Sequence, residues 1–311
     1  MKVLVSCPPM LGMLDEFAPL AEKRGVTLVP AKVTQILSEE ELMQLVPQHD
    51  GWIIGDDPAS RSVFEAGVRG QLKAAVKWGI GVDNVDFEAC RDLAIPIINT
   101  PNMFGKEVAD IAVAYTVGLA RQLFFIDQQI KADETAWPKP AGISLEGKQV
   151  GLIGFGDIGK NVAKRLSACD MHITAYDPGV AGDAGIANLT RAVWPEGIES
   201  MDFLVFTCAL NEKTHHMLNT ETLAKTKKGV YVINVARGPL IDEAALIQAL
   251  ENQQVCAAAL DVFEIEPLPK DSPLRSMPQC IFGSHNSSNT KDAVRRASYK
   301  ALDELFGFLN V

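Results

Sequence analysis

Three short segments of this chain carry side chains that could perform chemistry together. The first, Gly154-Phe155-Gly156-Asp157-Ile158-Gly159, has the glycine spacing that lets a backbone cradle a dinucleotide. Downstream of it come Arg237, Glu266 and His285. An arginine can bind a carboxylate through two parallel hydrogen bonds, and a histidine can exchange a proton near neutral pH. This set is sufficient to move a hydride to or from a carbon atom that also bears an oxygen and a carboxylate.

The glycine motif has the surroundings that a dinucleotide site requires. An apolar strand is expected before it at 149–153, and a helix is expected from 156 to 167. Gly154 would make the tight turn, and Gly156 would let the backbone approach a pyrophosphate. Gly159 would let the helix pack closely on the strand. The alternative interpretation is a glycine-rich turn that binds no ligand.

Asp177 ends the strand that is expected after this helix. Its carboxylate can accept hydrogen bonds from both hydroxyls of a ribose, and it would repel a 2′-phosphate. No arginine follows in Pro178-Gly179-Val180. The sequence therefore favours NAD over NADP.

Arg237 and His285 are both expected just after strands, where open α/β sheets bind their ligands. Arg237 precedes Gly238-Pro239, and its guanidinium could hold a substrate carboxylate and polarise a carbonyl. His285 lies in a polar loop, where Glu266 could hydrogen-bond its ring and fix the tautomer. Taken alone, each has a simpler interpretation, as a surface ion pair for the arginine and a surface or core residue for the histidine. We interpret the remaining histidines as structural or solvent-exposed: His49, His172, His215 and His216.

The composition is that of a soluble globular protein. The 311 residues are 47% hydrophobic and 22% charged, and 29 basic against 39 acidic residues leave a net charge of −10. An acidic chain is a poor candidate for binding nucleic acid or an anionic membrane. None of the six cysteines forms a CxxC pair, so we expect no metal site and interpret them as buried, reduced thiols. The apolar run at the N-terminus is too short for a secretory signal, so a cytoplasmic protein is expected.

Strand and helix patterns alternate along most of the chain, which predicts an α/β protein with parallel, doubly wound sheets. A helix without interruption is expected from Lys106 to Lys131. Strands are expected at 2–6, 51–54, 74–77, 149–153, 171–176, 203–207, 229–235 and 255–260. Further helices are expected at 15–24, 38–46, 60–69, 156–167, 242–251 and 291–309.

Over nearly its whole length the chain resembles the D-isomer-specific 2-hydroxyacid dehydrogenases, in particular their phosphoglycerate dehydrogenase-like branch. Trp78-Gly79-Ile80-Gly81-Val82-Asp83-Asn84-Val85-Asp86 is similar to the family's substrate loop, and Asn99-Thr100-Pro101-Asn102 to its interdomain crossing. The segments around Arg237, Asp261 to Pro267 and His285 resemble its arginine, glutamate and histidine motifs.

The resemblance implies two Rossmann-like domains, the first of them discontinuous. Residues 1–101 with 287–311 would form the substrate domain, and residues 102–286 the NAD-binding domain. By resemblance, His285 is the acid/base, Glu266 its partner and Arg237 the binder of the substrate, with the backbone amides of Ile80 and Gly81 holding a carboxylate oxygen. The resemblance places these residues at NAD: Gly154, Gly156, Asp157, Ile158, Gly159, Asp177, Cys208, Val235, Ala236 and Asp261.

The expected function is NAD-dependent interconversion of a D-2-hydroxy acid and its 2-keto acid, with a phosphoglycerate-like substrate considered. A glyoxylate or hydroxypyruvate reductase shares every motif named above, and an NAD(H)-sensing corepressor-type protein is the alternative from another class. Arg61, Lys77 and Lys106 are candidates for binding a second anionic group, although each could equally be an ordinary solvated cation. In place of the family's usual residues after the histidine, this chain has Asn286-Ser287-Ser288, which we expect to alter contacts near the nicotinamide. The resemblance also implies a homodimer, formed around the helix from Lys106 and the loop at Trp137.

Overall fold

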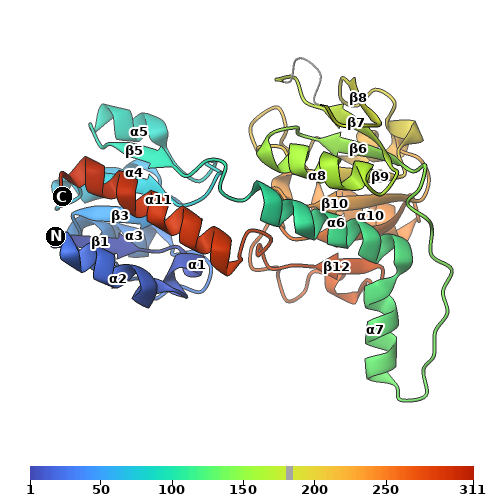
Figure 1. Ribbon diagram of the computed structural model, residues 1–311, viewed down its shortest axis with the longest axis horizontal. Helices are drawn as coiled ribbons and strands as arrows, with labels where there is room; N and C mark the ends of the chain where they lie inside the picture. The colour runs from blue at the N-terminus through green and yellow to red at the C-terminus, as the bar shows by residue number, and fades with distance from the viewer. Residues whose placement is uncertain (180–184) are drawn as a thin grey trace. The chain divides into compact units, whose positions relative to one another are not determined.

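A computed structural model describes residues 1–179 and 185–311 of the chain. It divides into two compact units (Figure 1). Unit 1 comprises Met1–Phe104 and Asn289–Val311, and unit 2 comprises Gly105–Ser288. The division falls a few residues later than the boundaries expected from the sequence, at both crossings of the chain. Val180, considered above with the NAD preference, lies outside the described residues.

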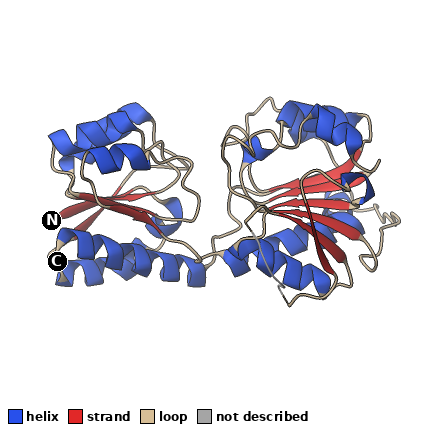
Figure 2. Ribbon diagram, turned by 90° about the horizontal axis from the view of Figure 1, so that it is seen from above, coloured by secondary structure: helices blue, strands red, loops and turns tan. Residues whose placement is uncertain are grey.

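Unit 1 is a parallel five-stranded sheet in the order β2-β1-β3-β4-β5, with helices on both faces (Figure 2). Its strands are β1 (Lys2–Val5), β2 (Thr27–Pro30), β3 (Gly51–Ile54), β4 (Ala74–Lys77) and β5 (Ile97–Asn99). Its helices are α1 (Pro8–Leu11), α2 (Leu14–Lys23), α3 (Glu39–Leu45), η1 (Val46–Gln48), α4 (Arg61–Arg69), α5 (Phe87–Asp92) and α11 (Lys291–Leu309).

The central strands of unit 1 are apolar on both sides because helices bury both faces of a parallel sheet. All four residues of β3 are buried, and Trp52 in this strand packs against Phe64 of α4. On the other face, α11 packs on β3 and β4. Leu305 of α11 lies so close to Gly51 that a Cβ there would sit 3.3 Å from its side chain. The last helix of the chain is therefore part of the core of the first unit.

Unit 2 is a parallel seven-stranded sheet in the order β12-β11-β10-β9-β6-β7-β8. Its strands are β6 (Gln149–Ile153), β7 (His172–Tyr176), β8 (Leu189–Ala192), β9 (Phe203–Phe206), β10 (Val230–Asn234), β11 (Val255–Leu260) and β12 (Cys280–Phe282). Its helices are α6 (Gly105–Arg121), α7 (Leu123–Ala132), α8 (Asp157–Ser167), η2 (Ile198–Ser200), α9 (Thr220–Lys225), η3 (Gly238–Leu240), α10 (Glu243–Glu251) and η4 (Pro273–Ser276).

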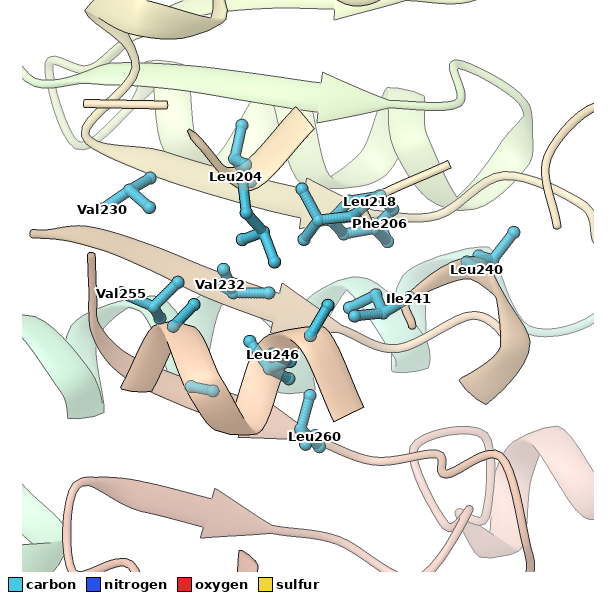
Figure 3. Close-up of a cluster of buried hydrophobic side chains, with 14 of the residues drawn as sticks. Leu204, Phe206, Leu218, Val230, Val232, Leu240, Ile241, Leu246, Val255 and Leu260 are labelled. Carbon is cyan, nitrogen blue, oxygen red and sulfur yellow. The ribbon is translucent and has the colours of Figure 1, made fainter. Parts of the chain in front are cut away.

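The core of unit 2 holds β9, β10 and β11 side by side. Figure 3 shows Leu204, Val232 and Leu260 from these strands, with Leu246 of α10 packed among them. Each of these four side chains is at least 97% buried, and burying such a side chain contributes about 1.5–3 kcal/mol. The strand ends that carry the candidate site residues are thus anchored in a cluster of buried apolar side chains. The expected doubly wound fold with parallel sheets is confirmed.

The expectation of one uninterrupted helix from Lys106 to Lys131 is wrong, because this segment forms two helices. The helix breaks at Gln122, whose φ of 53° is left-handed, and α6 and α7 meet at an angle of 67°. The bend lets Phe124 fold back onto α6, where a Cβ at Gly118 would lie 2.5 Å from its ring.

In the described part of the chain no single helix is long and apolar enough to cross a membrane. The bent pair α6 and α7 together has the length and composition that a span would need.

Candidate active site

The candidate catalytic residues follow the carboxyl ends of three neighbouring strands of unit 2. Arg237 comes after β10, Glu266 lies in the loop after β11, and His285 follows β12. Strands β12, β11 and β10 are adjacent and parallel, so their carboxyl ends lie at one edge of the sheet. The fold therefore brings these three segments, separated in sequence, to the same edge.

His285 and Glu266 form a direct pair. The Nδ1 atom of His285 lies 2.8 Å from Oε2 of Glu266, and each side chain is 21% exposed. The other carboxylate oxygen of Glu266 accepts a hydrogen bond of 3.0 Å from the backbone N–H of Phe263. The carboxylate is held by its own loop while it binds the ring. With Nδ1 donating to Glu266, the proton exchanged with a substrate would be carried by Nε2.

Asp261 accepts hydrogen bonds from the loop that carries His285. The backbone N–H of His285 donates to the Asp261 carbonyl at 2.6 Å, and the carboxylate of Asp261 accepts from Asn286 and Ser287. This environment fixes a backbone that histidine adopts at a cost, because the φ of His285 is 54°. A left-handed conformation at a residue other than glycine costs about 1–3 kcal/mol and persists only where the surroundings impose it.

Arg237 is placed by the turn that follows β10. The buried Asn234 side chain donates to the Arg237 carbonyl at 2.8 Å and accepts from the backbone N–H of Ala236 at 3.0 Å. The Nη1 atom of Arg237 donates to the Ala236 carbonyl at 2.9 Å. The next residue, Gly238, packs on the loop after β11, because a Cβ at this position would lie 2.0 Å from the Phe263 carbonyl oxygen. The arginine turn and the glutamate loop are consequently in backbone contact.

The glycine motif occupies the loop between β6 and α8. Gly154 has a φ of 95°, and a Cβ there would lie 2.6 Å from the backbone of Cys208, which follows β9. A Cβ at Gly159 would lie 2.2 Å from the Gly154 carbonyl oxygen. Both glycines are therefore required by close packing. Gly156 differs, because a Cβ there would meet no atom within 4 Å.

This open space lies at the N-terminus of α8, where free N–H groups and the helix dipole favour a negatively charged group. The sheet order also changes direction here, because β6 leads to β7 on one side and neighbours β9 on the other. Dinucleotides bind at such a switch point in open α/β sheets. The residues present fit a dinucleotide whose pyrophosphate would lie against Gly156 and the start of α8.

Asp177 and Asp157 have different surroundings. Asp177 follows β7, and its carboxylate accepts from the backbone N–H of Phe155 at 2.7 Å and of Gly179 at 2.8 Å. It is thus tied to the glycine loop, as a ribose-binding carboxylate should be. The Asp157 carboxylate lies against Gly105 at the start of α6, where a Cβ would lie 2.3 Å from it. It is therefore directed toward the N-terminus of another helix.

The remaining residues expected at NAD lie around the same strand ends. Val235 and Ala236 are buried after β10, and Ile158 is half-buried in the first turn of α8. Burial raises the pKa of the Cys208 thiol to about 12, so this side chain is neutral at physiological pH. Because Cys208 packs against Gly154, its side chain lines the nucleotide region and does not act as a nucleophile.

Ile80 and Gly81 belong to unit 1 and follow β4. The N–H of Gly79 donates to the Thr100 hydroxyl at 2.8 Å, and the Gly79 carbonyl accepts from the Thr100 N–H at 3.1 Å. The side chain of Asn99 donates to the Ile80 carbonyl at 3.1 Å. The end of β5 and the residue after it thus bind the loop after β4 and set the orientation of its peptide groups.

The three cations considered for a second anionic group are in different situations. Arg61 pairs with Asp92 at 2.7 Å. Lys77 is buried at the end of β4 and donates to the Gly55 carbonyl and to Asp56, the latter at 3.0 Å. Lys106 is exposed on α6, in unit 2. Two of the three are therefore engaged by carboxylates of their own unit.

Two contacts at this edge were not predicted from the sequence. The Ser287 hydroxyl donates to Asp261, and His216, interpreted as structural or exposed, pairs with Glu264 at 2.5 Å. The position of Ser287 after the histidine was noticed as unusual, but its partner depends on how the loop folds. No pattern around His216 indicated a carboxylate partner 48 residues away.

Comparison with known proteins finds relatives along nearly the whole chain. Residues 113–287 match the NAD-binding domain of the D-isomer-specific 2-hydroxyacid dehydrogenases. The chain is 35% identical over 281 residues to the hydroxypyruvate reductase of Thermotoga maritima, covering 88% of this chain and 90% of the relative. The chain belongs to the D-isomer-specific 2-hydroxyacid dehydrogenase family. Its cofactor is NAD, as the matched domain indicates.

Two further similar proteins differ in how much of their length the chain covers. The D-3-phosphoglycerate dehydrogenase of Methanocaldococcus jannaschii is 34% identical over 299 residues, and the match covers 95% of this chain but only 55% of that protein. The NAD-dependent formate dehydrogenase of Staphylococcus aureus, solved in complex with NAD, superposes with a TM-score of 0.85 at 26% identity, covering 100% of this chain and 96% of the other. The chain thus spans about half the length of the phosphoglycerate dehydrogenase and nearly all of the other two proteins.

Proposed function

We propose that this protein is an NAD-dependent dehydrogenase that interconverts a D-2-hydroxy acid and its 2-keto acid. The observation that carries the proposal is the hydrogen bond of 2.8 Å between His285 and Glu266, at the sheet edge that also holds Arg237. A proton donor, a carboxylate that orients it and a fixed cation are the groups that reduction of a 2-keto acid requires.

Arg237 has two roles in this proposal. Its guanidinium binds the carboxylate of the 2-keto acid and polarises the carbonyl at C2. The Asn234 contacts with the turn limit how far the arginine backbone can move, so the cation is oriented before substrate arrives. In unit 1, the backbone N–H groups of Ile80 and Gly81 are proposed to bind a carboxylate oxygen of the same class of substrate.

His285 supplies the proton. NAD, when bound as NADH, supplies the hydride that C2 accepts. The protonated imidazole gives its proton from Nε2 to the C2 oxygen, and Glu266 stabilises the imidazolium through Nδ1. In the oxidation direction His285 takes the proton back from the hydroxyl. General acid–base assistance of this kind is worth about 10²–10⁴-fold in rate.

The cofactor contacts follow from the strand ends already described. Gly154, Gly156 and Gly159 with the start of α8 would hold the pyrophosphate, and Asp177 the ribose hydroxyls. Cys208 and the segment Val235-Ala236 would line the path from the adenosine end toward the nicotinamide. Asp261 is also proposed to contact NAD, and its carboxylate accepts three hydrogen bonds from the loop of His285.

For the substrate tail we propose a short, unphosphorylated group, as in hydroxypyruvate or glyoxylate. The carboxylates that pair with Arg61 and Lys77 support this, because a cation already matched by a carboxylate gains less from a phosphate. The nearly full-length similarity to a hydroxypyruvate reductase points in the same direction. A phosphoglycerate-like substrate is the competing possibility, tested by comparing the two keto acids directly.

We also propose that the protein acts in the cytoplasm as a homodimer, with α7 in the interface. No residue of α7 is buried, and several of its side chains are large and apolar. Leu123, Phe124 and Ile130 are 51%, 42% and 41% exposed, and Trp137 in the following loop is 76% exposed. Several large apolar side chains left exposed on one helix and the loop after it are typical of a contact between proteins. Sedimentation velocity of the purified protein tests this: a species of one chain mass at micromolar concentration would refute it.

The decisive experiment is NADH oxidation with a panel of 2-keto acids: hydroxypyruvate, glyoxylate, pyruvate, phosphohydroxypyruvate and 2-ketoglutarate, with NADPH in parallel. We expect turnover with NADH and a short acid. His285→Gln should abolish turnover while leaving the dissociation constant of NADH nearly unchanged. Tight NADH binding by the unmodified protein without turnover of any acid would reject the dehydrogenase in favour of a cofactor-sensing protein.

A further inference from the structure

The loop that carries His285 is organised around one buried carboxylate. Asp261 is 2% exposed, and three consecutive backbone N–H groups converge on it. His285 donates to its carbonyl oxygen at 2.6 Å, Asn286 to Oδ1 at 3.2 Å and Ser287 to Oδ2 at 3.0 Å. The loop therefore wraps around a single residue, which follows the neighbouring strand β11.

Ser287 adds a fourth donor through its side chain. Its hydroxyl lies 2.5 Å from Oδ2 of Asp261, and the residue is only 6% exposed. A hydrogen bond to an ionised oxygen is shorter and stronger than one between neutral groups. The hydroxyl and the N–H of Ser287 both donate to the same oxygen. Together they prevent the Asp261 carboxylate from rotating about its Cβ–Cγ bond.

The orientation of this carboxylate matters for what packs beside it. A Cβ at Gly283 would lie 2.0 Å from Oδ1 of Asp261, so the chain leading to His285 passes directly over that oxygen. A carboxylate free to rotate would press on the backbone at 283 or release the N–H of Asn286. Either movement shifts the two residues between them, Ser284 and His285, the second of which already has a left-handed φ of 54°.

We infer that Ser287 is a positioning residue for His285: by clamping the Asp261 carboxylate it keeps the imidazole Nδ1 on Glu266 and Nε2 directed at the substrate oxygen. Ser287 touches neither ring nor substrate in this assignment. Its effect on turnover rests on the proposed function, whereas its effect on the His285–Glu266 hydrogen bond does not.

The test compares Ser287→Ala with Ser284→Ala. Ser284 is the exposed serine on the other side of His285, so its loss removes a hydroxyl from the same loop without touching Asp261. Ser287→Ala keeps the backbone N–H on Asp261, and we therefore expect a folded protein, checked by its thermal unfolding midpoint. The first readout is the NMR signal of the Nδ1 proton of His285, shifted downfield by Glu266 and assigned by its absence in His285→Gln.

We expect Ser287→Ala to broaden or abolish this proton signal and to lower kcat for the preferred keto acid by between about tenfold and a hundredfold, the range for a small misplacement of a reacting group. The dissociation constant of NADH should change less than about twofold, and Ser284→Ala should match the unmodified protein in all three measurements.

Two results would overturn the inference. One is a proton signal in Ser287→Ala as sharp as in Ser284→Ala. The other is weaker NADH binding with kcat unchanged, which would assign the Asp261–Ser287 pair to the cofactor. If the unmodified protein turns over no keto acid but Ser287→Ala loses the proton signal, the proposed function fails and the positioning role stands.

Discussion

Gly238 lies against the backbone of Phe263 so closely that no other residue can occupy its position without displacing one of the two loops. A Cβ there would lie 1.9 Å from the Phe263 carbonyl carbon. This contact joins the turn that carries Arg237 to the loop that carries Glu266, and through Glu266 it reaches His285. The spacing of the candidate catalytic groups is therefore set by a backbone contact.

Gly238→Ala should for this reason damage both stability and catalysis. Overpacking of a tight site costs about 1–3 kcal/mol, which lowers the thermal unfolding midpoint by several degrees in a protein of this size. We expect kcat/KM for the keto acid to fall at least about tenfold as Arg237 moves relative to Glu266. The control is Gly307→Ala in α11, where a Cβ would meet no atom within 4 Å and the midpoint should hold or rise. Full activity in Gly238→Ala would contradict the assignment.

Gly156→Ala tests the cofactor position separately from stability. A Cβ at Gly156 also meets no protein atom, so the unfolding midpoint should stay within about 2 °C of the unmodified protein. The added methyl enters the space in front of α8 and should raise the dissociation constant of NADH at least about tenfold. Fluorescence titration with NADH measures this, and unchanged affinity would place the pyrophosphate elsewhere.

Asn99→Ala should act on substrate binding alone. It removes the hydrogen bond that orients the Ile80 carbonyl. The neighbouring amides, proposed to bind a carboxylate, are then no longer held in one direction. We expect KM for the keto acid to rise about three- to tenfold, with kcat and the NADH dissociation constant unchanged. Asn99→Asp keeps the shape but not the donor and should behave alike. A normal KM in both variants would remove Asn99 from this role.

Arg61→Ala separates the two kinds of substrate tail. Because Arg61 is paired with Asp92, we expect no change in KM for hydroxypyruvate or for phosphohydroxypyruvate. An increase confined to the phosphorylated acid would show that the arginine leaves Asp92 to bind phosphate and would revive the phosphoglycerate-like substrate. Asp92→Ala, which frees the same arginine, is the matched comparison.

Asp50 should make stability depend on acid pH. The ammonium of Lys73, followed by the backbone N–H of Lys2, holds the pKa of Asp50 below its usual range. A lowered pKa in the folded state means that the stabilisation is complete above the ordinary pKa of aspartate, near 4, and is lost as the pH falls through the folded value. Asp50→Asn should lower the free energy of unfolding at pH 7 by on the order of 1 kcal/mol. Urea unfolding should show the two proteins converging below about pH 4, and a constant difference down to pH 3 would contradict this origin.

Strands with continuous apolar sequence were predictable to the residue. The expected bounds 51–54, 74–77 and 255–260 coincide with β3, β4 and β11, because burial of both faces makes such strands mostly apolar, with Lys77 at the end of β4 as the charged exception. Edge strand β8 was missed, since its residues Leu189–Ala192 are half-buried or exposed and alternate weakly. The break at Gln122 was missed because the residues on either side all suit a helix, and only the packing of Phe124 on Gly118 reveals the bend.

Some contacts of the candidate site could likewise be predicted from the sequence, and others could not. Arg237 and Glu266 could be predicted because they follow the strands expected at 229–235 and 255–260. His285 was predicted from its polar loop and from the resemblance, since β12 (Cys280–Phe282) was not among the strands given bounds. The hydrogen bond between Glu266 and the His285 ring was expected and is present. The contacts of Asp261 with Ser287 and of Gly238 with Phe263 depend on how loops from different strands meet, and no periodic pattern in a single segment encodes such a meeting.

The discontinuity of unit 1 sets an order for biosynthesis. Residues 105–288 leave the ribosome as one uninterrupted piece and can complete their sheet while the chain is still being made. Residues 1–104 must wait, because the helix that covers β3 and β4 is translated only after the whole of unit 2. Until then β3 and β4 lack their cover on one face, although α2 already packs on β2. We therefore expect that a truncation that removes α11 destabilises residues 1–104 more than unit 2.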